Sequence, residues 1–151
     1  VLFSYAGLAV GDLMSGLTSQ ILRSRKKVVL IFLILTVLFS AFYLSMRSPT
    51  LELFYTACFL LGVGGGYWAI FVTIASEQFG TNVRATVTTS VPNFVRGSVV
   101  LLTSCFGFLK GYFGITTSAA MTGCLALTVA FAALVTLHET FSKDLNYLET
   151  Q

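Results

Sequence analysis

The chain has 151 residues, of which 56% are hydrophobic and only 10% charged, and its mean hydropathy is +0.86. A soluble domain usually carries about 25% charged residues, so this composition argues strongly against a water-soluble enzyme. The net charge of +3 is better explained by membrane topology than by nucleic-acid binding. The three cysteines stand singly in apolar segments, a spacing that indicates neither a disulfide framework nor a metal site. We expect no metal and no cofactor.

Five apolar runs occupy nearly the whole chain, each close to the ~20 residues that a membrane-spanning helix needs. No strand periodicity competes with them, so the sequence predicts an all-α integral membrane protein with five transmembrane helices in residues 1–137 and a polar tail at 138–151. Because the first run begins at Val1 without an initiator Met, we expect the chain to be a piece of a longer protein. The predicted spans are 1–22, 28–46, 51–75, 85–113 and 116–137.

Lys and Arg in the connecting segments predict the orientation, because cytoplasmic loops are enriched in these residues. One side holds six of them and the other two: Arg23, Arg25, Lys26, Lys27, Arg84 and Lys143 against Arg47 and Lys110. This count places the tail and the segments 23–27 and 76–84 in the cytoplasm. We expect a multi-pass protein of the plasma (inner) membrane, with its C-terminus cytoplasmic and the lipid bilayer as its surroundings.

Three segments resemble the major facilitator superfamily, and in particular its sugar-porter-like members. Residues 16–27, between the first two runs, are similar to the G-x-x-x-D-R-x-G-R-R/K loop, with Ser24, Arg25 and Lys26 at its end and no Asp before them. Residues 77–85 resemble the E-x-x-P-x-x-x-R-A/G segment, with Gly in place of Pro, and the tail from His138 resembles P-E-T-K-G, with His in place of Pro.

This resemblance covers the whole chain, as spans eight to twelve of a twelve-span transporter. It implies membership of the C-terminal six-helix bundle, alternating access against a missing N-terminal half, and a small-molecule solute bound near the midplane. It also implies a cytoplasmic gate network of charges that locks one conformation, formed by Arg25, Lys26, Glu77 and Arg84. The alternative for these charges is a set of solvated loop residues that contribute ~0–1 kcal/mol.

Two charged residues fall inside predicted spans. Asp12 precedes Arg23 by 11 residues, about 16 Å of helix, and Arg96 follows Arg84 by 12 residues, about 18 Å. Half of a ~30 Å hydrocarbon core is ~15 Å, so both charges lie near the midplane at similar depth. We expect them to form a pair that handles substrate or protons, the alternative being an ion pair that only holds two helices together.

Polar residues around both charges recur at helical spacing, which indicates that these faces meet protein or water rather than lipid. Asn93 belongs to the stripe around Arg96, and Pro92 interrupts that stripe at a point suited to bending. The third run contains four glycines at 62 and 64–66, typical of close helix packing. A second interpretation makes these glycines a flexible gate, with Tyr67 or Trp68 facing the solute.

Together these features predict a secondary active transporter that moves a small solute by alternating access, coupled to protons. Neither an ATP-binding P-loop nor a hydrolase or metalloprotease motif occurs in the chain, so we expect no enzyme activity. A non-transporting five-span membrane subunit or assembly factor is the alternative.

Overall fold

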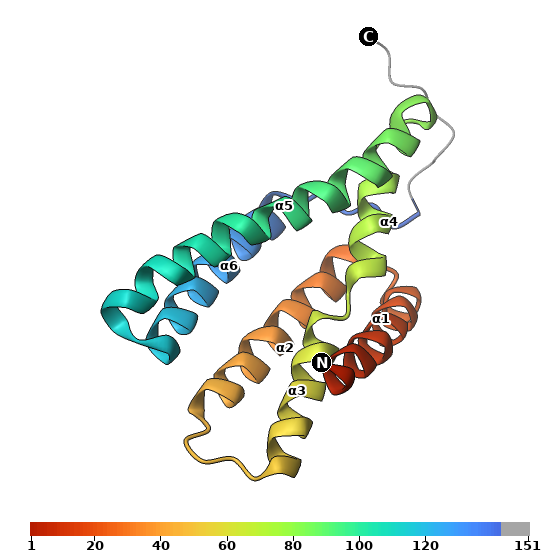
Figure 1. The fold of residues 1–151 in the computed structure, drawn as a ribbon. Coiled ribbons are helices and arrows are strands. Elements are labelled where there is room, and N and C mark those ends of the chain that lie inside the picture. The colour runs from red at the N-terminus through yellow and green to blue at the C-terminus, as the bar shows by residue number, and fades with distance from the viewer. Residues whose placement is uncertain (143–151) are drawn as a thin grey trace.

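The computed structural model describes residues 1–142, and the predicted contribution of Lys143 and of the rest of the tail lies outside this range. The described chain is helical throughout its regular structure and has no strand (Figure 1). Its helices are α1 (Leu2–Leu22), α2 (Arg25–Ser45), α3 (Leu51–Gly65), α4 (Trp68–Gln78), α5 (Thr81–Phe113) and α6 (Ile115–Thr136).

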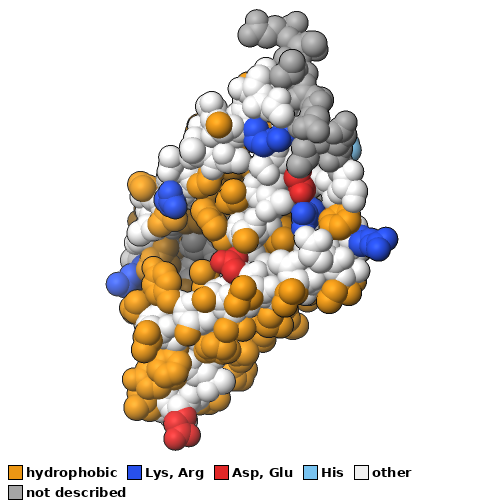
Figure 2. All heavy atoms as spheres, turned by 90° about the vertical axis from the view of Figure 1, so that its right-hand side faces the viewer, with side chains coloured by type: hydrophobic (Ala, Val, Ile, Leu, Met, Phe, Trp, Pro, Cys, Tyr) orange, Lys and Arg blue, Asp and Glu red, His pale blue; other side chains and the backbone are white. Residues whose placement is uncertain are grey.

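Four helical segments are long and apolar enough to cross a membrane: α2, the combined segment of α3 and α4, α5 and α6. The α1 helix has 21 residues and the length of a span, but Asp12 and several Ser and Gln residues lower its hydropathy. Many large hydrophobic side chains lie exposed on the surface of the structure. This is expected of a surface that faces lipid. In Figure 2 hydrophobic side chains gather over the lower part of the face shown, and Lys and Arg side chains lie above them.

The helices form two groups that meet at α2 and α4. The α1 and α2 helices pack against α3, while α5 and α6 form an antiparallel hairpin that contacts α4 and α2 (Figure 1). A small buried core joins the two groups where α2 meets α4, formed by Val28, Phe32, Ile70 and Ile74. No residue of α5 is buried, so this helix contributes little to the core.

The closest contact is between α1 and α3, where glycines let the two backbones touch. A Cβ atom on Gly62 would lie 2.1 Å from the carbonyl oxygen of Ser4, and one on Gly66 would lie 2.4 Å from the Cα of Gly11. Tight packing therefore explains these two glycines. Nothing lies within 4 Å of a Cβ placed on Gly107 or Gly111 of α5, so these two glycines have no close neighbour among residues 1–142.

The third apolar run, predicted as a single span at 51–75, is not one continuous helix, although its two parts together are long and apolar enough to cross a membrane. The α3 helix ends at Gly65, and Gly66 and Tyr67 leave the helical conformation with φ/ψ of −80°/58° and −128°/22°. The chain then resumes as α4 and continues to Gln78. Consecutive glycines make the helix weak here, and the contact of Gly66 with α1 holds the bend in place.

The fourth run also differs from its prediction. The α5 helix begins at Thr81 instead of 85, so part of the expected 76–84 loop is helical, and it continues past Pro92 as one element.

Candidate functional site

The break between α3 and α4 exposes the N-terminus of α4 inside a segment that is long and apolar enough to cross a membrane. The first amides of a helix have no partner within that helix. Asp12 supplies one from α1: its carboxylate accepts a hydrogen bond of 3.2 Å from the amide of Ala69, the second residue of α4. A negative charge at this end is also favoured by the helix dipole. Asp12 is therefore the N-terminal cap of α4.

Arg96 of α5 reaches the same end of α4. Its guanidinium lies 5.8 Å from the centre of the Trp68 ring, a cation–π contact, and donates a hydrogen bond of 3.1 Å to the side-chain oxygen of Asn93. The Trp68 ring is in turn 5.5 Å from that of Phe71, one turn further along α4. The first turn of α4 thus lies between an acid on α1 and a base on α5.

The expected direct pair of Asp12 and Arg96 is not formed in this conformation. Within the described residues the ion pair that is present joins Arg25 to Glu77. Asp12 binds Ala69 and Arg96 stacks on Trp68, so the two charges converge on adjacent residues without meeting. The physical reason is the helix break: it creates free amides that a continuous third span would not offer.

The Arg25–Glu77 pair lies at the other end of α4. The Arg25 guanidinium contacts Glu77 through two hydrogen bonds of 3.0 and 3.4 Å, and donates another of 2.6 Å to the Ser19 hydroxyl on α1. Glu77 is only 7% exposed and also accepts a hydrogen bond of 2.7 Å from the hydroxyl of Thr140. Because both charges are largely buried, this is not a solvated surface pair.

Glu139 closes the same end of the molecule by capping α2. Its carboxylate accepts hydrogen bonds from the amides of Arg25 (2.8 Å) and Lys26 (3.4 Å), the first two residues of α2, and from the Ser24 hydroxyl. Burial raises the pKa of Glu139, but the hydrogen bonds from Ser24 and from the amides of Phe141, Arg25 and Lys26 outweigh it and lower the pKa to about 2.

Lys26 completes this arrangement from α2. Its ammonium group donates to the carbonyl oxygens of Val135 and Leu137, at 3.0 and 2.8 Å, at the C-terminal end of α6. A cation at this position satisfies carbonyls that lack a partner within the helix. The start of α2 and the end of α6 therefore cap each other.

Arg84 contacts the end of α4. Its guanidinium donates to the carbonyls of Ser76 and Phe79, at 2.9 and 3.1 Å, and so caps the C-terminal end of α4.

All four residues predicted for the gate network thus lie at one end of the molecule, around the end of α4 and the start of α2. The predicted gate network did not include Ser19, Glu139 or Thr140. The resemblance of the tail to P-E-T-K-G was the signal that could have drawn attention to Glu139.

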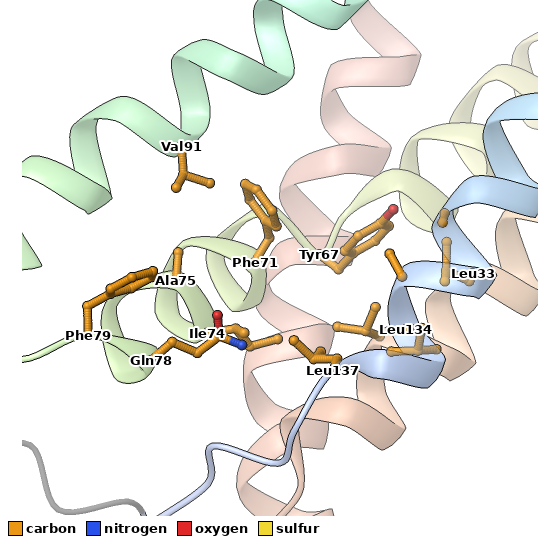
Figure 3. A pocket seen from close by; sticks show the side chains of 13 residues that line it. Leu33, Tyr67, Phe71, Ile74, Ala75, Gln78, Phe79, Val91, Leu134 and Leu137 are labelled. Carbon is orange, nitrogen blue, oxygen red and sulfur yellow. The ribbon is translucent and has the colours of Figure 1, made fainter.

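A cavity of about 470 Å³ lies between α2, α4, α5 and α6 (Figure 3). Tyr67 and Phe71 enter it from the start of α4, Leu33 from α2, and Leu134 from α6. Tyr67 therefore faces this cavity, whereas Asp12 is not among the residues that line it. No cluster of metal-ligating side chains occurs in residues 1–142.

Comparisons with protein-family models, curated proteins and solved structures find no match for this chain.

Proposed function

We propose that this chain is part of a secondary active transporter of the major facilitator type, which moves a small solute across the plasma (inner) membrane by alternating access. In this proposal α1 is a fifth span, the basic end is cytoplasmic, and the missing half of the transporter completes the solute pathway. The observation that carries the proposal is the interruption between α3 and α4: α4 begins as a separate helix with an acid and a base at its first turn. Such interrupted helices form the binding sites of many transporters.

The short helix α4 is the element we expect to move. It has 11 residues, and an acid connects each of its ends to another helix. Asp12 of α1 contacts its start, and Glu77 near its end pairs with Arg25 of α2. The break at Gly66 and Tyr67 leaves it joined to α3 by a bend instead of a rigid helix. A change in charge at either acid therefore alters the position of α4 relative to α1 and α2.

Asp12 supplies the proposed proton coupling. Protonation removes the negative charge that favours the positive end of α4, and the neutral carboxyl is a weaker acceptor for the amide of Ala69. Loss of this cap costs helix stability of about 0.5–2 kcal/mol. That energy is enough to shift a balanced two-state equilibrium several-fold.

The test uses the complete protein in liposomes loaded with a pH-sensitive dye, challenged with sugars, carboxylates and drugs. We expect at least one solute to drive proton movement, and Asp12→Asn to abolish that movement while leaving solute exchange measurable. The matched control is Glu52→Gln, which removes an exposed acid from the first turn of α3. Absence of flux with every solute in a folded protein would contradict the proposal and favour a non-transporting membrane subunit.

A second test addresses the Arg25–Glu77 pair. Removing one partner of a buried pair typically costs ~3–5 kcal/mol, because the remaining charge has no compensation. We expect Glu77→Gln to lower both thermal stability and transport, and the double change Arg25→Gln/Glu77→Gln to recover stability without recovering transport. Full transport by the double variant would show that these charges only hold the fold together.

A further inference from the structure

The cavity between α2, α4, α5 and α6 has the size of a small-molecule site. Its volume of about 470 Å³ lies within the range of roughly 300–1,000 Å³ that is usual for ligand pockets. Four helices contribute to its wall, and small side chains such as Ala75, Ala130 and Ala133 leave the space open.

The chemistry of the wall is simple. No charged side chain lines the cavity, and its polar side chains are those of Tyr67 and Gln78, at opposite ends of α4. Figure 3 shows the Tyr67 ring among apolar side chains, between Phe71 and Leu33. A charged molecule would lose its hydration here without gaining a counter-ion, which is strongly unfavourable.

The Tyr67 hydroxyl favours a ligand that carries a hydrogen-bond acceptor. It has no hydrogen-bond partner among residues 1–142, although its neighbours are almost all apolar. The hydroxyl is not fully buried, and Tyr67 lines the cavity. A ligand that offers an acceptor to this hydroxyl gains a hydrogen bond, which a plain hydrocarbon chain does not.

We propose that this cavity binds a small, uncharged and mainly apolar molecule that accepts a hydrogen bond from Tyr67. The proposal goes beyond the proposed function, because binding here does not require that the protein transports the molecule. Phe71 lines the cavity and also contacts Trp68. Occupancy of the cavity is therefore sensed at the first turn of α4, where Arg96 stacks on the same tryptophan.

The test is equilibrium dialysis of the complete protein in lipid nanodiscs, with empty nanodiscs subtracted. The two probes are 1-acetylnaphthalene, whose carbonyl is an acceptor, and 1-ethylnaphthalene, which has a similar shape and no acceptor. We expect saturable binding of both probes. Tyr67→Phe should weaken the ketone by about threefold to tenfold, the worth of one hydrogen bond, and leave 1-ethylnaphthalene unchanged.

A second variant locates the site. Ala133→Leu fills the cavity and should reduce binding of both probes at least tenfold, whereas Ala132→Leu, at an exposed neighbouring position outside the lining, should leave binding intact. Equal weakening of both probes by Tyr67→Phe, or unchanged binding by Ala133→Leu, would overturn the proposal. Binding that occurs in detergent and disappears in lipid would also overturn it, because a lipid acyl chain would then be the occupant.

Discussion

The glycine contact between α1 and α3 allows a sharp test, since two nearby glycines of the same helix have opposite surroundings. A Cβ atom on Gly62 would lie 2.1 Å from the carbonyl oxygen of Ser4 and 2.9 Å from the amide nitrogen of Leu8, whereas one on Gly65 meets nothing within 4 Å. Gly62→Ala and Gly65→Ala therefore add the same methyl group to the same helix. Only the first change creates a clash.

The magnitude follows from these distances. An ordinary contact to a Cβ atom is 3.4 Å or longer, so α1 must retreat by about 1 Å from α3 when Gly62 becomes alanine. Overpacking of this kind typically costs ~1–3 kcal/mol. Gly65→Ala has no such penalty and gains ~0.5–1 kcal/mol, because alanine loses less conformational freedom in a helix than glycine.

The same displacement affects the candidate site. Asp12 lies on α1, and its hydrogen bond to Ala69 is already 3.2 Å long, so a retreat of about 1 Å breaks it. Gly62→Ala should therefore lower transport as well as stability. The assay is thermal unfolding in one detergent, followed by the emission of Trp68, the single tryptophan of these 151 residues. Equal melting temperatures for the two variants would refute the packing argument.

Three further predictions concern charge and topology. The pKa of Glu139 is lowered to about 2 from 4.5, so the stabilisation from its carboxylate is complete above about pH 4.5 and is lost as the pH falls towards 2. Glu139→Gln should therefore make the melting temperature less dependent on pH in this range. An unchanged pH profile of the melting temperature would contradict the capping of α2 by Glu139. Arg96→Gln removes the cation from the Trp68 ring and should shift the fluorescence emission maximum, whereas an identical spectrum would argue against the contact. A cysteine placed at Ser48 should react with an impermeant reagent from outside the cell and one at Ser142 should not; the reverse pattern would invert the proposed orientation.

The helices themselves could be predicted from the sequence because lipid imposes a simple requirement on them. A spanning helix must be apolar over ~20 residues, and polar breaks between such runs mark the helix ends. The predicted spans 28–46 and 116–137 accordingly differ by only one to three residues at each end from α2 and α6, which are Arg25–Ser45 and Ile115–Thr136.

The break in the third span could not be located in this way. Residues 51–75 form one uninterrupted apolar run, and the glycines within it favoured close packing but were also compatible with a flexible gate. The structure shows close packing of Gly62 against α1 and an end of the helix between Gly65 and Tyr67. The flexible gate stays a prediction. The deciding contact, Gly66 against Gly11, joins residues far apart in the sequence.

The pairing of Asp12 with α4 follows from that break. Depth alone suggested that Asp12 and Arg96 neutralise each other, because two opposite charges at one level in a membrane usually pair. A helix N-terminus carries about half a positive charge, however, and the break places one beside Asp12. Backbone amides therefore compete with Arg96 for the same carboxylate. If α4 moves away from α1 during transport, Asp12 loses Ala69, and Arg96 becomes the alternative partner on the opposite side of the same turn. The direct pair and the capped helix are then two states of one site, and the position of α4 selects between them.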